Sequence, residues 1–261
     1  MKTKLSMNTK EIGFRLKNEF GLNYYPIGVY FADNVPEGAK RFTGKGNGCI
    51  VPLIFSSAKG KVVAIDKDST GWNCSAFYLG YQDWIFEGIE NFLSDGNVRG
   101  RTAERFVKTP GQAKEFVNSF VPEKINQKVT VFKPLEEFLD SEVPELVVFF
   151  ANPDEMSGLI FLMHYNVPES DNLVVTGFNS GCGSIFTKPM KLIREGHRKA
   201  VWGMHDIAAR LRLPADVMTL AMPYSMVAEM AANLDTSFMI TECWGKIKKR
   251  NRDVVNISDD Q

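Results

Sequence analysis

The sequence predicts an α/β fold: a single domain with a mixed β-sheet flanked by helices. Short runs rich in β-branched and aromatic residues alternate with longer stretches of helical apolar spacing. No low-complexity linker divides the chain, no internal repeat is evident, and 261 residues can bury one sizeable core. We therefore expect one domain over residues 1–248 and a flexible tail over residues 249–261, where the sequence turns basic and then acidic.

The individual elements follow from capping residues and apolar spacing. Asn8 can cap a first helix whose apolar stripe is Ile12, Leu16 and Phe20, and Gly21 ends it. Further helices are expected over residues 49–58, from 73 or 75 towards 92, after 109–111, over 156–165, after 182 and from 223 to 234. Strands are expected over residues 25–31, 62–65, 128–132, 146–150, 173–176 and 218–222.

The charge balance excludes several classes of partner. Lys plus Arg and Asp plus Glu both number 31, which removes the electrostatic case for general binding to nucleic acid or anionic membranes. No apolar run reaches the roughly 18–20 residues of a membrane span, and residues 1–10 lack the apolar stretch of a secretory signal. We expect a cytoplasmic protein, whose four cysteines are free thiols, metal ligands or catalysts and not disulfides.

The cysteines are the most informative residues. Cys49, Cys74 and Cys182 each lie in a short loop flanked by Gly or Asn, which allows the backbone to approach a bulky partner closely. Thiolates bind zinc, copper or iron–sulfur clusters, but no two cysteines show the close spacing of a structural zinc site. The spacings are 25, 108 and, to Cys243, 61 residues, so a shared site would have to be assembled by folding. Spacing alone favours unrelated buried or free thiols.

A second feature is the glycine-rich loop over residues 41–49. Its three alternating glycines could form a backbone nest for a phosphate or carboxylate, with Arg41 and Lys45 supplying charge, although a surface turn explains the same pattern. The loop matches neither the P-loop nor the dinucleotide-binding fingerprint. Arg194 and Arg198, in a basic segment, are further candidates for holding an anion.

Among the histidines, His205 is the best candidate for a metal ligand. Asp206 or a carbonyl group could orient its ring, although a single histidine of this kind is more often structural. The chain has no Gly-x-Ser-x-Gly elbow, no His-Glu-x-x-His motif and no EF-hand loop, so the corresponding hydrolase, metalloprotease and calcium-binding classes are not indicated.

An ordered series of motifs adds a family resemblance. The series runs Tyr25-Pro26-Ile27-Gly28-Val29, Gly48-Cys49 before an apolar helix, Cys74 followed by Leu79-Gly80, Gly181-Cys182, and Ala221-Met222-Pro223. It resembles the domain-of-unknown-function family 169, anaerobe-associated proteins of bacteria and archaea, over residues 10 to 235.

This resemblance implies a metal or iron–sulfur centre in reductive anaerobic metabolism. Cys49, Cys74 and Cys182 match cysteine positions of the family. Family members commonly carry a further cysteine in a Gly-Cys segment followed by arginine, where this chain has residues 202–206. A fourth ligand here would be His205, Cys243, an exogenous group or nothing.

Our leading hypothesis is an iron–sulfur protein with a 4Fe-4S cluster held by Cys49, Cys74 and Cys182. It would act in electron transfer, or as an oxidoreductase on a small anionic molecule, so its partner is a small-molecule substrate or a redox partner protein. One alternative is a non-catalytic carrier of zinc, haem or another cofactor that meets partners through an exposed apolar face over residues 222–230. Another is an enzyme with one reactive thiol, Cys182. The sequence leaves self-association into a homo-oligomer open.

Overall fold

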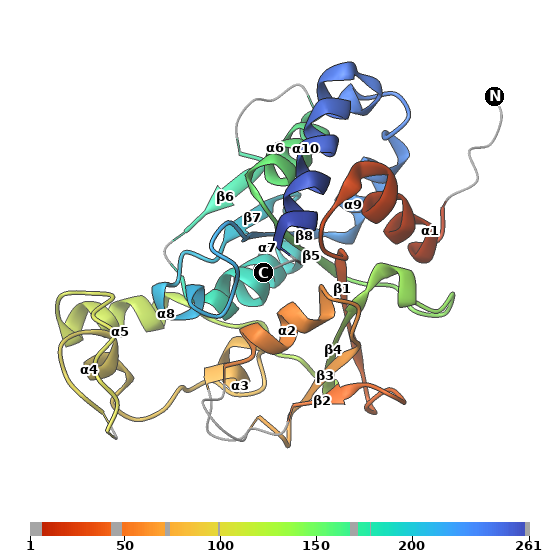
Figure 1. Ribbon diagram of the computed structural model, residues 1–261. Helices are drawn as coiled ribbons and strands as arrows, with labels where there is room; N and C mark the ends of the chain where they lie inside the picture. The colour runs from red at the N-terminus through yellow and green to blue at the C-terminus, as the bar shows by residue number, and fades with distance from the viewer. Residues whose placement is uncertain are drawn as a thin grey trace.

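A mixed β-sheet of eight strands with helices on both faces forms the described part of the chain (Figure 1). The computed structural model describes residues 7–42, 49–70, 74–98, 100–167, 172–177 and 179–258, with side chains up to residue 251. The strands are β1 (Ile27–Ala32), β2 (Lys40–Arg41), β3 (Val63–Asp66), β4 (Val129–Pro134), β5 (Leu146–Ala151), β6 (Val174–Thr176), β7 (Ala200–Gly203) and β8 (Met218–Pro223). The predicted α/β class is confirmed.

The helices begin largely where capping residues predict. They are α1 (Thr9–Phe14), η1 (Arg15–Gly21), α2 (Val51–Ser57), α3 (Cys74–Tyr78), α4 (Ile89–Leu93), α5 (Pro110–Ser119), η2 (Leu135–Glu137), α6 (Pro153–His164), η3 (Gly183–Thr187), α7 (Lys188–Arg194), α8 (Ile207–Arg210), α9 (Tyr224–Ala232), η4 (Phe238–Ile240) and α10 (Glu242–Ser258). The Asn8 side chain accepts the Glu11 N–H, and Thr109 and Asn152 each form a reciprocal capping box. No helix in the described residues is both long and apolar enough to cross a membrane.

The strand order contains an internal repeat that is not evident from the sequence alone. Outward from the centre, one half of the sheet reads β1, β4, β3, β2 and the other reads β5, β8, β7, β6. The outermost pairs, β2–β3 and β6–β7, are parallel, and every other pair is antiparallel. The order and directions therefore obey a two-fold rotation about an axis between β1 and β5. Different insertions in the two halves, α4 and α5 in the first and α6 in the second, hide this repeat from the sequence.

Two large hydrophobic cores cover the two faces of the sheet. In β5, Val148 and Phe150 face the first core, and Val147 and Phe149 face the second, as strand alternation requires. The first core packs against α2, α3, η3, α7 and α8, and the second against α1, η1, α6, α9 and α10. Because both faces are covered, β5 is apolar throughout, which explains its strong sequence signal.

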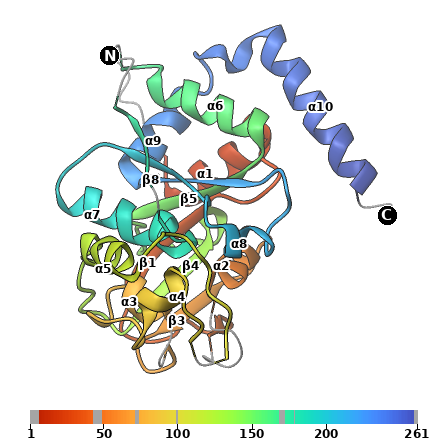
Figure 2. The same ribbon diagram turned by 90° about the vertical axis from the view of Figure 1, so that its left-hand side faces the viewer.

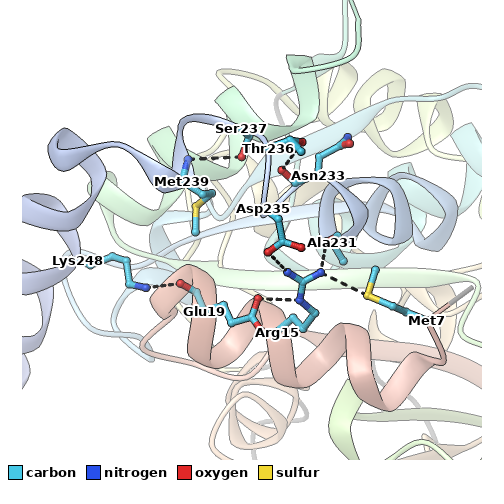
Figure 3. A network of polar contacts seen from close by, with 10 residues as sticks. All are labelled: Met7, Arg15, Glu19, Ala231, Asn233, Asp235, Thr236, Ser237, Met239 and Lys248. Carbon is cyan, nitrogen blue, oxygen red and sulfur yellow. Dashed lines mark hydrogen bonds and ion pairs between the residues drawn. The ribbon is translucent and has the colours of Figure 1, made fainter. Parts of the chain in front are cut away.

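A polar network ties three helical segments together on the second face (Figure 3). Arg15 donates hydrogen bonds to the Glu19 carboxylate at 2.7 Å, to Asp235 at 2.6 Å and to the Ala231 carbonyl at 3.1 Å. Lys248 donates to the Glu19 carbonyl, so η1 is bound both to the end of α9 and to α10.

The region over residues 222–230 does not form the exposed apolar face that a carrier would need. Met222, Met226 and Met230 are all buried in the second core. They are buried because β8 is an interior strand and α9 packs its apolar side against the sheet. The tail expected from residue 249 continues α10 as far as Ser258.

The helix predicted from residue 73 or 75 towards 92 is wrong. It breaks after Tyr78, because Gly80 has φ +78°, and a separate helix, α4, forms later. The Gly80 carbonyl accepts the Ile125 N–H, and a Cβ at Gly80 would lie 1.9 Å from the Glu123 carbonyl oxygen. The left-handed turn and the close approach both require glycine.

We expect Gly80→Ala to destabilise the protein by about 3 kcal/mol, through backbone strain and overpacking together. Gly196→Ala is the matched control, since Gly196 also has positive φ, +74°, but nothing lies within 4 Å of its added Cβ. The control should cost only about 1 kcal/mol. Urea unfolding measures both changes, and equal losses would show that the contact at Glu123 does not constrain the turn.

Candidate thiol-lined site

Three cysteines from distant parts of the chain line one cavity on the first face of the sheet. The cavity has a volume of about 350 Å³, and Cys49, Cys74 and Cys182 are all in its wall. Cys49 lies just before α2, Cys74 is the first residue of α3, and Cys182 immediately precedes η3. Each thiol therefore stands at the start of a helix. Figure 2 shows α8 beside α2, with α3 and α4 below them, and α10 at the opposite end of the molecule.

Close backbone packing brings the Cys182 loop to the other two. A Cβ at Gly181 would lie 3.2 Å from side-chain atoms of both Val51 in α2 and Ala209 in α8, so a larger residue would require these neighbours to shift. At Gly183 a Cβ would lie 1.8 Å from the Asn179 side chain. The glycines flanking Cys182 therefore allow its loop to pack closely against neighbouring parts of the protein itself, including α2 and α8. Residues 43–48 and 71–73, which precede Cys49 and Cys74, lie outside the described residues.

The start of α2 supplies hydrogen-bond donors to two of the sulfurs. The Val51 N–H donates to the Cys49 thiol, and the Ile50 N–H donates to the Cys182 thiol. Both donors belong to the N-terminal end of the helix, whose N–H groups have no partner within the helix. Such bonds stabilise a sulfur that carries negative charge.

The raised pKa values of all three thiols nevertheless keep them protonated at neutral pH. Burial raises the pKa of Cys49, raises the pKa of Cys74 to about 12 and raises the pKa of Cys182 well above its ordinary value. The neighbouring cysteines add to the rise at Cys74 and Cys182, which shows that the sulfurs lie within electrostatic range of one another. Deprotonation therefore requires a positive partner, which weighs against Cys182 as a lone activated nucleophile.

Two carboxyl groups also line the cavity. Asp206 accepts the Gly181 N–H at 2.8 Å and the Ala209 N–H at 3.0 Å, so it fastens the Cys182 loop to α8. Burial, together with the nearby Asp206 charge, raises the pKa of Glu104 to about 7, and Arg101 opposes this rise. A substantial fraction of the Glu104 carboxyl groups is therefore protonated near neutral pH.

The remaining wall is apolar, with positive charge and hydroxyl groups added. Most of its apolar residues come from the segment that carries α4 and α5: Ile85, Phe86, Ile89, Phe92, Leu93, Phe106 and Phe116. Arg101 and Arg212, both exposed, supply the positive charge, and buried Tyr78 makes a hydrogen bond to Ser180. These groups gave no motif in the sequence, because they come from separate loops and only the fold assembles them.

Neither candidate for the fourth ligand lies in this wall. His205 is exposed, its Nε2 lies 3.0 Å from the Thr176 hydroxyl, and its ring lies against Trp202. Asp206 does not orient this ring, because its two oxygens bind backbone N–H groups elsewhere. Cys243 is exposed at the start of α10.

The arginines proposed to hold an anion are paired with carboxylates away from the cavity. Arg41 forms an ion pair with Asp66 at 2.5 Å, and Arg194 forms one with Glu145 at 2.7 Å. Arg198 is paired with Glu229. None of the three is among the cavity-lining residues, and Lys45 lies outside the described part of the chain.

The fold and the cavity together define an α/β protein with a thiol-lined site, and a family comparison agrees with the sequence motifs. The family model of DUF169, described as an uncharacterised ArCR family, matches residues 15–233. The chain belongs to this family, which confirms the predicted resemblance. No curated protein and no solved structure matches the chain.

We expect the cavity thiols of the metal-free protein to react slowly with iodoacetamide at neutral pH, whereas exposed Cys243 reacts first. A rise from 9.0 to about 12 at Cys74 lowers the reactive thiolate fraction on the order of a thousandfold. Mass spectrometry of labelled peptides measures the order, with Cys243→Ser as the control. Rapid labelling of Cys182 alone would instead support a catalytic thiol.

The protonation of Glu104 should appear in the pH dependence of stability. Because its pKa is raised from 4.5 to about 7 in the folded state, the native protein binds more protons than the unfolded chain in this interval. Glu104 therefore contributes a loss of stability as the pH rises from 4.5 to 7, and Glu104→Gln removes this contribution. Urea unfolding across this range should show the variant gaining on wild type. Exposed Glu87→Gln controls for the lost charge, and a pH-independent difference would contradict the assignment.

Proposed function

We propose that this chain is an iron–sulfur protein whose cluster is held by Cys49, Cys74 and Cys182, and that it acts in electron transfer or reductive chemistry on a small anionic molecule. The observation that carries the proposal is that these three thiols, far apart in sequence, line a single cavity.

The donor set suits a group with several metal atoms. No three His, Cys, Asp or Glu side chains among the described residues are arranged to hold one metal ion. The three thiols instead line the wall of one cavity. In an iron–sulfur cluster, each cysteine ligand binds a different iron atom. The positive cluster would also supply the charge that these thiols, one buried and two partly buried, need in order to ionise.

The remaining cavity groups support chemistry on a small anion. A cluster supplies single electrons, and an iron without a cysteine ligand also acts as a Lewis acid. Arg101 and Arg212 would attract the negative group of the substrate, and the apolar residues around α4 would hold its carbon skeleton. Glu104, whose pKa is about 7, can deliver a proton near neutral pH to a reduced substrate.

The test is anaerobic reconstitution with iron and sulfide, followed by absorbance and metal analysis. We expect a coloured protein with about four irons per chain, as in a 4Fe-4S cluster. Single serine variants of Cys49, Cys74 and Cys182 should each lose most of the iron, whereas Cys243→Ser and His205→Ala should load like wild type. A colourless wild-type protein, or equal loading of all variants, would refute the proposal.

A further inference from the structure

The two-fold arrangement of the sheet relates the cavity-lining positions in pairs. In the first half, Cys49 follows β2 at the start of α2, and in the second half Cys182 follows β6 at the start of η3. The third strand of each half is also followed by a cavity-lining residue at a helix start. Cys74 follows β3 at the start of α3, and Asp206 follows β7 as the N-cap of α8. Asp206 is therefore the counterpart of Cys74.

The contacts of Asp206 agree with this placement. It lines the same cavity as the three thiols. Its charge contributes to the raised pKa of Cys49, Cys74 and Cys182, so it lies within electrostatic range of all three sulfurs. Its neighbour His205 is turned away towards Thr176.

We infer that Asp206 is the fourth ligand of the site, a carboxylate that completes the set of three thiolates. This inference rests on the proposed function, because it assigns the remaining position of the same cluster. A carboxylate has roughly four acceptor positions, and the Gly181 and Ala209 N–H groups use two of them. Those two bonds fix the orientation of the carboxylate, as outer hydrogen bonds do for metal ligands in general.

The chemical consequence is one iron that is held less firmly than the other three. Thiolate is a softer ligand than carboxylate and is the usual one in clusters, so the iron bound by Asp206 is the exchangeable one. One-electron oxidation by ferricyanide, which becomes ferrocyanide, tests this directly. A 4Fe-4S cluster of charge 2+ gives up one electron, releases one Fe²⁺ and leaves a 3Fe-4S cluster of charge 1+.

The experiment compares reconstituted wild type with Asp206→Cys and Asp206→Asn. Wild type should release about one of its four irons on oxidation and show the EPR signal of a three-iron cluster. Asp206→Cys should keep all four, because it supplies a fourth thiolate. Asp206→Asn keeps an acceptor oxygen for capping but loses the charge, so it should hold about three irons even before oxidation. His205→Ala and Cys243→Ser are controls that should behave like wild type.

Each possible result decides the matter. Iron release from Asp206→Cys and Asp206→Asn equal to that of wild type would overturn the assignment, as would a wild type that keeps all four irons. If His205→Ala or Cys243→Ser instead changed the iron release, the fourth ligand would be assigned to that residue. Thermal melting of the metal-free variants identifies misfolding, and if Asp206→Cys misfolds, Asp206→Asn alone decides. A wild type that takes up no cluster refutes the proposed function itself, whereas a loaded wild type with unresponsive Asp206 variants refutes only this inference.

Discussion

The site depends on the close contact between the Cys182 loop and the start of α2. Gly181 lies against Val51, the Ile50 N–H reaches the Cys182 sulfur, and Asp206 holds the Gly181 N–H from the other side. A Cβ at Gly181 would lie 3.2 Å from the Val51 side chain, so a larger residue would require the loop or its neighbours to shift. The contact therefore links the two halves of the sheet at the place where their cysteines meet.

The prediction from sequence succeeded where local signals dominate. The apolar run of β5 and the capping box at Asn152 identify a strand and the following helix without knowledge of the tertiary fold. It failed where backbone geometry or insertions intervene: the positive φ of Gly80 divides one expected helix, and unequal insertions conceal the repeat. A trace of that repeat does exist in the sequence, because a Gly-Cys pair precedes both α2 and η3.

The candidate site was predictable to a similar extent. The glycine-flanked cysteines pointed to residues that the fold brings to one cavity. Sequence could not distinguish His205 from Asp206, since adjacent residues in a loop point in different directions and only the backbone decides which faces the thiols. Arg101 and Glu104 lie in a polar stretch without a motif, so their role depends on how that stretch packs across α4.

The symmetric strand order also bears on the origin of the molecule. A four-stranded unit that paired edge to edge with an identical copy through its first strand would form the same central junction as β1 and β5. In such a dimer, the positions of Cys49 and Cys182 would be the same residue in two identical subunits, related by the symmetry axis. Fusion of two such copies would allow the two halves to diverge, which agrees with Cys at position 74 and Asp at position 206.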